Sequence, residues 1–194
     1  SYIVEGGKSG HYAKTKTMMH QDETTWHGLM ERLTKILIEY LNGQIAAGAD
    51  AVQLFDSWVG SLSPDDYRHY VMPHVKQLID GIDKSAPVIN FSTGNPALLP
   101  LMKEAGGDVI GLDWRCDLAE AWSVLGDDVA VMGNMDPIML YTSPKEIRAQ
   151  VQAILDKAAG RPGHIFNLGH GILPDMPPEN VAELVDAVHE LSMR

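Results

Sequence analysis

Short continuous apolar runs recur along the chain and predict buried strands. None of them alternates apolar with polar residues, and this continuity is the pattern of strands that are buried on both faces of a parallel sheet. The opening letters, residues 1–4, predict the end of a further strand. The runs occupy residues 51–55, 88–91, 109–112, 129–132 and 165–168.

Amphipathic helices are expected between the runs. Ser63-Pro64 and Ser143-Pro144 each place an N-cap serine before a proline at the first helical position, and Glu146 stands where a capping box needs it. Pro177-Pro178-Glu179 predicts the start of the last helix. Before the first run, apolar side chains recur at helical spacing: Leu29, Leu33, Ile36, Leu37, Tyr40 and Leu41.

The resulting βαβαβαβαβα order predicts an α/β fold, since parallel strands need crossovers of about a dozen residues. Two architectures fit: a doubly wound sheet, or part of a (β/α)8 barrel. A complete TIM barrel takes about 250 residues and eight strands, whereas this chain has 194 residues and five runs. We expect residues 1–194 to form one large domain or part of a bigger one, with upstream sequence missing.

Composition excludes several classes of protein. The sequence contains neither an apolar run of the roughly 20 residues that a membrane helix needs nor a signal peptide. The single cysteine, Cys116, fits a reducing compartment, so we expect a cytoplasmic protein. A net charge of −11 argues against a nucleic-acid or anionic-membrane surface, although a local positive pocket could still take an anionic small molecule.

Polar side chains follow every predicted strand. In α/β folds ligands bind beyond the carboxyl ends of the strands, so these segments predict a polar pocket. For the aspartates Asp56, Asp113 and Asp136, helix capping or backbone hydrogen bonding is the alternative. His170 lies between two glycines, which offer no side chain to bury it. The strand-end segments are Phe55-Asp56-Ser57-Trp58-Val59-Gly60, Ser92-Thr93-Gly94-Asn95, Gly111-Leu112-Asp113-Trp114-Arg115, Gly133-Asn134-Met135-Asp136-Pro137 and Asn167-Leu168-Gly169-His170-Gly171.

Several catalytic motifs fail to match. Gly7-Lys8-Ser9 ends like a P-loop, but Tyr2 stands where the earlier glycine is required. No dinucleotide fingerprint and no G-x-S-x-G elbow is present. His69 and His74 are five apart, unlike H-E-x-x-H, and one cysteine offers too few ligands for a thiolate zinc site.

Taken in order, the strand-end segments and Tyr2-Ile3-Val4-Glu5-Gly6-Gly7 resemble the carboxyl-terminal part of the uroporphyrinogen decarboxylase family. The resemblance runs from Tyr2 to His189, and the G-N-x-D-P and N-L-G-H-G pieces are its specific part. It implies a (β/α)8 barrel that is incomplete here, with roughly the last five βα units. It also implies conversion of the four acetates of uroporphyrinogen to methyls, giving coproporphyrinogen, without metal or organic cofactor, by a cytosolic homodimer.

The resemblance implies substrate-binding roles for Tyr2, Ser57 and His170: a hydroxyl facing the substrate, a carboxylate donor and a donor to a peripheral carboxylate. The catalytic residues stay unknown, because the family's arginine-rich segment and the aspartate that faces the pyrrole N–H groups precede residue 1. We therefore expect the chain alone to bind uroporphyrinogen weakly and not to decarboxylate it. Open strand edges at 51–55 and 165–168 predict self-association, or local disorder around residues 5–17.

Two rival interpretations remain. A cobalamin- or thiol-linked methyltransferase of the same superfamily would hold zinc through His and Cys, and Cys116 is the only thiol. A non-catalytic tetrapyrrole-binding fragment would keep the pocket without turnover.

Overall fold

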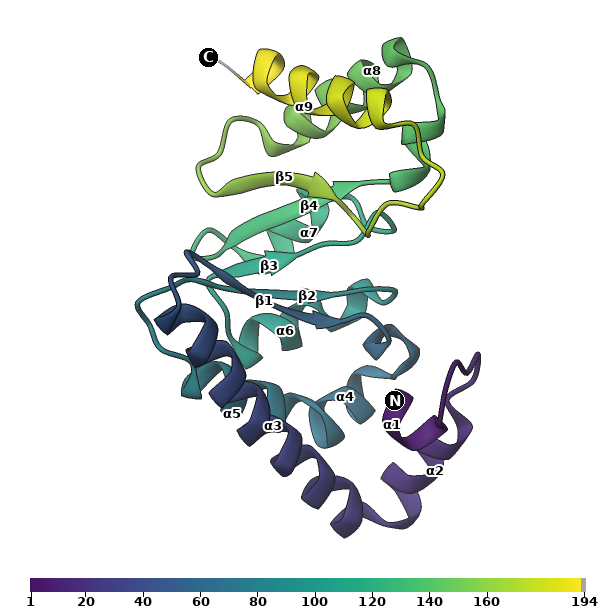
Figure 1. Cartoon of the computed structure of the whole chain (residues 1–194), viewed down its shortest axis with the longest axis vertical. Coiled ribbons are helices and arrows are strands. Elements are labelled where there is room, and N and C mark those ends of the chain that lie inside the picture. The colour runs from purple at the N-terminus through teal and green to yellow at the C-terminus, as the bar shows by residue number, and fades with distance from the viewer. Residues whose placement is uncertain (193–194) are drawn as a thin grey trace. The chain divides into compact units, whose positions relative to one another are not determined.

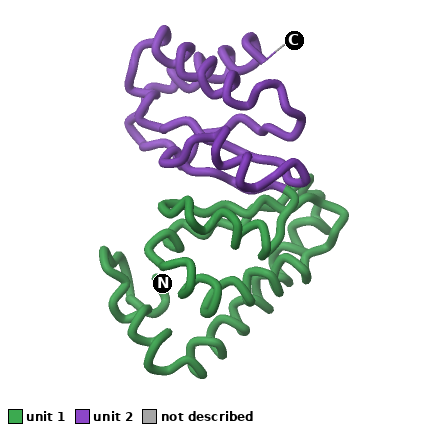
Figure 2. Tube along the Cα trace, turned by 180° about the vertical axis from the view of Figure 1, so that it is seen from behind, with its two compact units in different colours: residues 1–108 green, residues 109–194 purple. Residues whose placement is uncertain are grey.

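A computed structural model describes residues 1–192 of the chain, and these divide into two compact units, before and after the boundary between Asp108 and Val109 (Figure 2). The first unit contains two strands and the second contains three (Figure 1). In the first unit the elements are α1 Tyr2–Glu5, α2 Ala13–Gln21, α3 Glu23–Ala46, β1 Val52–Asp56, η1 Val59–Ser61, α4 Pro64–Tyr70, α5 Met72–Gly81, β2 Val88–Ser92, η2 Pro96–Leu98 and α6 Leu99–Ala105. In the second they are β3 Val109–Gly111, α7 Leu118–Leu125, β4 Ala130–Met135, η3 Pro137–Tyr141, α8 Pro144–Ala158, β5 His164–Leu168 and α9 Pro178–Ser192.

All strand pairs within the units are parallel, as the continuous apolar runs predicted. In the first unit β1 pairs with β2, with Val52 opposite Val88. In the second unit β4 lies between β3 and β5, with Val109 opposite Ala130 and Val131 opposite His164. Because parallel neighbours end at the same edge, the polar segments that follow the strands of one unit gather at one edge of its sheet.

Caps predicted from the sequence begin the helices. Ser63 Oγ accepts the backbone N–H of Asp66 at 3.1 Å at the start of α4. At α8 Ser143 and Glu146 form the expected reciprocal capping box, with Ser143 N–H donating to Glu146 Oε2 at 2.9 Å. Each cap satisfies amide groups that have no partner inside the helix, which fixes where the helix starts.

The apolar cores lie between the helices and the strands of each unit. In the first unit α3 and α5 pack on β1 and β2 through the buried residues Leu41, Val52, Leu78, Ile79, Ile82 and Val88. In the second unit the least exposed side chains include Trp122, Leu125, Val131, Met135, Leu140, Ile147 and Val151. Within residues 1–192 no helix combines the length and the apolar character that crossing a bilayer would require.

Two local predictions are wrong. Residues 2–5 form the short helix α1 and not a strand end, because their backbone bonds are local: Val4 and Glu5 N–H both donate to Ser1 O, and Gly6 ends the turn at φ 76°. Burial on both faces holds for β3 and β4 but fails for β1 and β5. Among the described residues β1 pairs only with β2 and β5 only with β4, and Phe55 is 71% exposed. The expectation of open edges at these two strands is thereby met.

Candidate functional site

The turn after β1 carries Ser57, one of the predicted substrate-binding residues. Ser57 is half-buried, and its backbone carbonyl accepts the Thr93 hydroxyl at 2.6 Å. Gly60 brings the same turn against the segment after β2, where a Cβ would lie 2.1 Å from Thr93 O. Only glycine fits such an approach, so the two strand-end segments of the first unit are packed backbone to backbone.

Tyr2 lies beside this turn. Its ring stands edge-on to Trp58, the residue after Ser57, with 5.8 Å between ring centroids. Glu5 holds α1 in place, because its Oε1 accepts both the backbone N–H and the hydroxyl of Thr15 at 2.9 Å. These hydrogen bonds lower the pKa of the Glu5 carboxyl. The first unit therefore gathers Tyr2 and the segment that carries Ser57.

Asp56 is the unusual carboxylate of this edge. Burial raises its pKa to about 6, although the amino-terminal ammonium opposes the shift. The side chain lines a cavity of about 120 Å³ together with Lys16, Met19 and Trp26, among others. Burial, followed by the nearby Asp56 charge, also raises the pKa of Tyr67. Asp56 is therefore a strand-end carboxylate whose surroundings raise its pKa toward neutrality.

The alternative of helix capping or backbone hydrogen bonding is confirmed, as capping for Asp136 and as backbone hydrogen bonding for Asp113. Asp136 Oδ1 accepts the backbone N–H of Ile138 at 3.0 Å and caps η3. Asp113 is buried, and its carboxylate accepts the backbone N–H of Arg115 at 2.9 Å and the Arg115 guanidinium at 2.5 Å. Asn134 completes this network: its Nδ2 donates to Asp113 O at 2.9 Å and to Cys116 O at 2.8 Å.

His170 is exposed at the end of β5, as the flanking glycines predicted. The two glycines differ, however. Gly169 is buried against backbone, since a Cβ there would lie 2.4 Å from Trp114 N, whereas a Cβ on Gly171 would meet nothing within 4 Å. Gly169 therefore packs the β5 end onto the β3 end, whereas Gly171 leaves open space. That packing places the His170 ring edge-on to Trp114, 6.0 Å between centroids.

Arg115 belongs to the same cluster as Trp114 and His170, and the sequence did not indicate this. Its guanidinium forms an ion pair with the Asp113 carboxylate. Its guanidinium also lies 3.9 Å from the centroid of the Trp114 ring. The side chains of His170 and Arg115 thus both contact Trp114. Arg115 follows β3 and His170 follows β5, so the sequence alone did not indicate that they share a contact.

Cys116 is a neutral thiol. Burial, followed by the Asp113 charge, raises its pKa to about 11. Its Sγ donates to Asp113 O at 3.4 Å. Zinc-binding and nucleophilic cysteines need the opposite environment, one that favours the thiolate. The surroundings of Cys116 therefore disfavour the methyltransferase interpretation.

The family follows from a match over nearly the whole chain. A family model described as uroporphyrinogen decarboxylase matches residues 1–191. The chain belongs to the uroporphyrinogen decarboxylase family. Curated relatives that carry this name are 50% identical in Trichlorobacter lovleyi over 194 residues and 51% identical in Carboxydothermus hydrogenoformans over 193 residues. They are covered over 57% and 55% of their length, by 100% and 99% of this chain, so the chain spans little more than half of these relatives.

Solved structures support the fold of this uroporphyrinogen decarboxylase family chain. A methyltransferase from Methanosarcina mazei superposes with a TM-score of 0.80 at 23% identity, over 92% of this chain and 53% of that one. A putative vitamin-B12 independent methionine synthase from Listeria monocytogenes gives a TM-score of 0.67 at 10% identity, over 91% of this chain and 58% of that one. At such identities the likeness concerns the fold alone. With the family match and the parallel strands, it indicates an incomplete TIM-barrel-like fold.

Proposed function

We propose that this chain is the carboxyl-terminal portion of a uroporphyrinogen decarboxylase, comprising roughly the last five βα units of its barrel. The proposed reaction converts the four acetates of uroporphyrinogen to methyls and yields coproporphyrinogen for haem synthesis. The observation that carries the proposal is about 50% identity, along the whole chain, to relatives named for this activity. The cytoplasmic location and the homodimer remain part of the same proposal.

The hydrogen-bond donors at the strand ends of each unit suit a ligand that carries several carboxylates. Loss of CO₂ from a pyrrole-linked acetate needs an electron sink, which a protonated pyrrole ring provides, and the new carbon then takes up a proton. The protein must orient the departing carboxylate and hold those that stay. In our proposal His170, Ser57 and Tyr2 donate hydrogen bonds to the substrate, while the acid and the main arginines come from sequence outside residues 1–194.

A chimera tests the proposal. The segment of the Geobacter sulfurreducens relative that precedes the matching region would be fused to this chain, which is 50% identical to that relative. Anaerobic turnover of uroporphyrinogen to coproporphyrinogen is the readout. We expect an active chimera and an inactive isolated chain. An inactive but folded chimera would contradict the proposed activity, and coproporphyrinogen from the chain alone would contradict the expectation that it lacks essential groups.

Substitution of His170 tests the site within that chimera. A hydrogen bond to a charged group contributes about 1.5–3 kcal/mol, so His170→Ala should lower kcat/KM roughly 10- to 150-fold. His189→Ala is the matched control, because His189 is also exposed but lies on α9. Equal activity of the two variants would remove His170 from the substrate site.

A further inference from the structure

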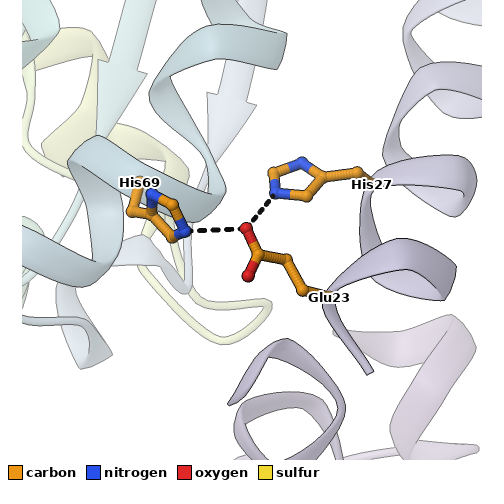
Figure 3. Close-up of side chains that lie close together, drawn as sticks. All are labelled: Glu23, His27 and His69. Atoms are coloured by element: carbon orange, nitrogen blue, oxygen red, sulfur yellow. Dashed lines mark hydrogen bonds and ion pairs between the residues drawn. The ribbon is translucent and has the colours of Figure 1, made fainter. Parts of the chain in front are cut away.

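A histidine-rich cluster on the helices of the first unit lies outside the strand-end segments (Figure 3). Glu23 is the first residue of α3, His27 lies one turn later, and His69 is near the end of α4. His69 Nε2 lies 2.8 Å from Glu23 Oε1, and His27 Nε2 lies 3.4 Å from the same oxygen. The three ligand atoms all lie within 4.8 Å of one another.

His74 orients the His27 ring through a hydrogen bond at His27 Nδ1. His27 Nδ1 and His74 Nε2 are 2.7 Å apart, which is a hydrogen bond that holds one shared proton. His74 is 6% exposed and sits in α5, so a buried side chain sets the direction of the half-buried ring. When His27 donates its Nδ1–H, its Nε2 lone pair points toward Glu23. Histidines that bind metals in proteins typically use their second nitrogen in this way.

The scaffold of the cluster does not depend on the three ligand side chains. Trp26 is buried, and its Nε1 donates to Tyr70 O at 2.8 Å, which joins α3 to the end of α4. The Tyr70 ring stands edge-on to His69, 4.5 Å between centroids, and stacks with His27 at 6.3 Å. Both imidazoles are therefore held before any ligand binds, which reduces the entropy lost on binding.

Two imidazole nitrogens thus converge on one carboxylate oxygen. Both can donate to it only when both rings carry a proton on Nε2, and His27 Nδ1 then accepts the His74 proton. In the tautomer in which His27 donates to His74, a divalent cation accepts both Nε2 lone pairs and the carboxylate together. Two histidines and one glutamate, with a position left for water, form a donor set that zinc uses in proteins.

We propose that Glu23, His27 and His69 bind a divalent transition-metal cation, with Zn²⁺ as the probe, and that the ion links α3 to α4. The ligands differ from the thiolate set that the sequence argued against, since none is a cysteine. Glu23 and His69 are 46 positions apart, so spacing along the chain gave no sign of them. Their side chains are 51% and 59% exposed, which leaves a path for the ion from solvent.

Titration of the metal-free chain with ZnCl₂ by calorimetry, at one fixed pH, tests the proposal. We expect one Zn²⁺ per chain, and at least a tenfold weaker affinity in His69→Ala and, separately, in Glu23→Gln. Both residues are exposed, so circular dichroism should show folded variants. The controls are His20→Ala, an exposed histidine near the cluster that contacts Tyr70, and His189→Ala on α9.

The variants separate the outcomes. Affinity that is unchanged in His69→Ala and Glu23→Gln, or that falls equally in His20→Ala or His189→Ala, would overturn the site. So would the absence of calorimetric binding in the parent chain. As a second readout, saturating Zn²⁺ should raise the melting temperature of the parent and of both controls more than that of the two ligand variants, because a ligand stabilises only the state that binds it.

Discussion

The close approach of Gly169 to the β3 end allows a direct test of the strand-end geometry. An added Cβ would lie 2.4 Å from Trp114 N, 2.9 Å from Asp113 C and 3.1 Å from Asp113 Cα. All three atoms belong to backbone, so no side-chain rotation relieves the clash. Ordinary contact distances require one of the two strand ends to move by about 1 Å.

The expected loss of stability is large for a single methyl group. Overpacking a closely packed site costs about 1–3 kcal/mol, and the upper end applies where backbone has to shift. The movement also strains the hydrogen bond from Gly169 N–H to Met135 O, which is 2.7 Å long. We expect Gly169→Ala to lower the free energy of unfolding by about 3 kcal/mol, which for a protein of this size lowers the melting temperature by roughly 6–12 °C.

Gly171→Ala is the matched control two residues away. Its Cβ would meet no heavy atom within 4 Å, so the change should stay within about 1 kcal/mol of the parent. Thermal and urea unfolding, followed by far-UV circular dichroism, would measure both variants. If Gly169→Ala had the same melting temperature as Gly171→Ala, the β5 end would not pack on the β3 end as described. The placement of His170 beside Trp114 would then lose its support.

Two further substitutions and one alkylation experiment probe the buried polar groups. The pKa of Asp56 in the folded state is about 6, so the folded state binds more protons than the unfolded state and stability falls as pH rises from about 4 to 6. Asp56→Asn should therefore raise the free energy of unfolding by about 3 kcal/mol at pH 8 and leave it unchanged below about pH 4, with the exposed Asp186→Asn as control. Cys116, with a pKa of about 11, should react with iodoacetamide at pH 8 roughly 100-fold more slowly than an ordinary thiol, and an ordinary rate in the folded chain would show that the thiol is not buried as described. Asn134→Ala removes the donor to Asp113 O and Cys116 O and should lower the free energy of unfolding by about 2–3 kcal/mol in urea titrations; a loss under 0.5 kcal/mol would contradict the network.

The strands and helix starts could be predicted because they depend on local sequence. The continuous apolar run 129–132 predicted a buried strand, and β4 occupies Ala130–Met135 there. Ser143 and Glu146 satisfy each other's neighbouring amides within one turn, so the start of α8 required no tertiary information. The strand prediction for residues 1–4 is wrong because β-branched and aromatic residues favour strands only where a neighbouring strand offers backbone partners.

The side-chain clusters depend on tertiary packing and were less predictable. The exposure of His170 followed from its glycines, but its contact with Trp114 requires the buried approach of Gly169. The raised pKa of Asp56 depends on which groups surround it, and the sequence reveals only that a carboxylate follows a strand. The cluster of Glu23, His27 and His69 joins two helices that are separated by β1 in the chain.

The electrostatics of the strand ends indicate which residues can serve an anionic ligand. With a net charge of −11, the protein as a whole repels a polyacidic substrate, so binding must come from local donors. Arg115 is anchored by Asp113 and stacked on Trp114, which orients its guanidinium but also offsets its charge. The exposed imidazole of His170 stands edge-on to that same indole. A carboxylate that approached this cluster would meet donors already held in place, and for that reason His170, with Trp114 and Arg115 around it, is the part of the proposed site whose loss should matter most.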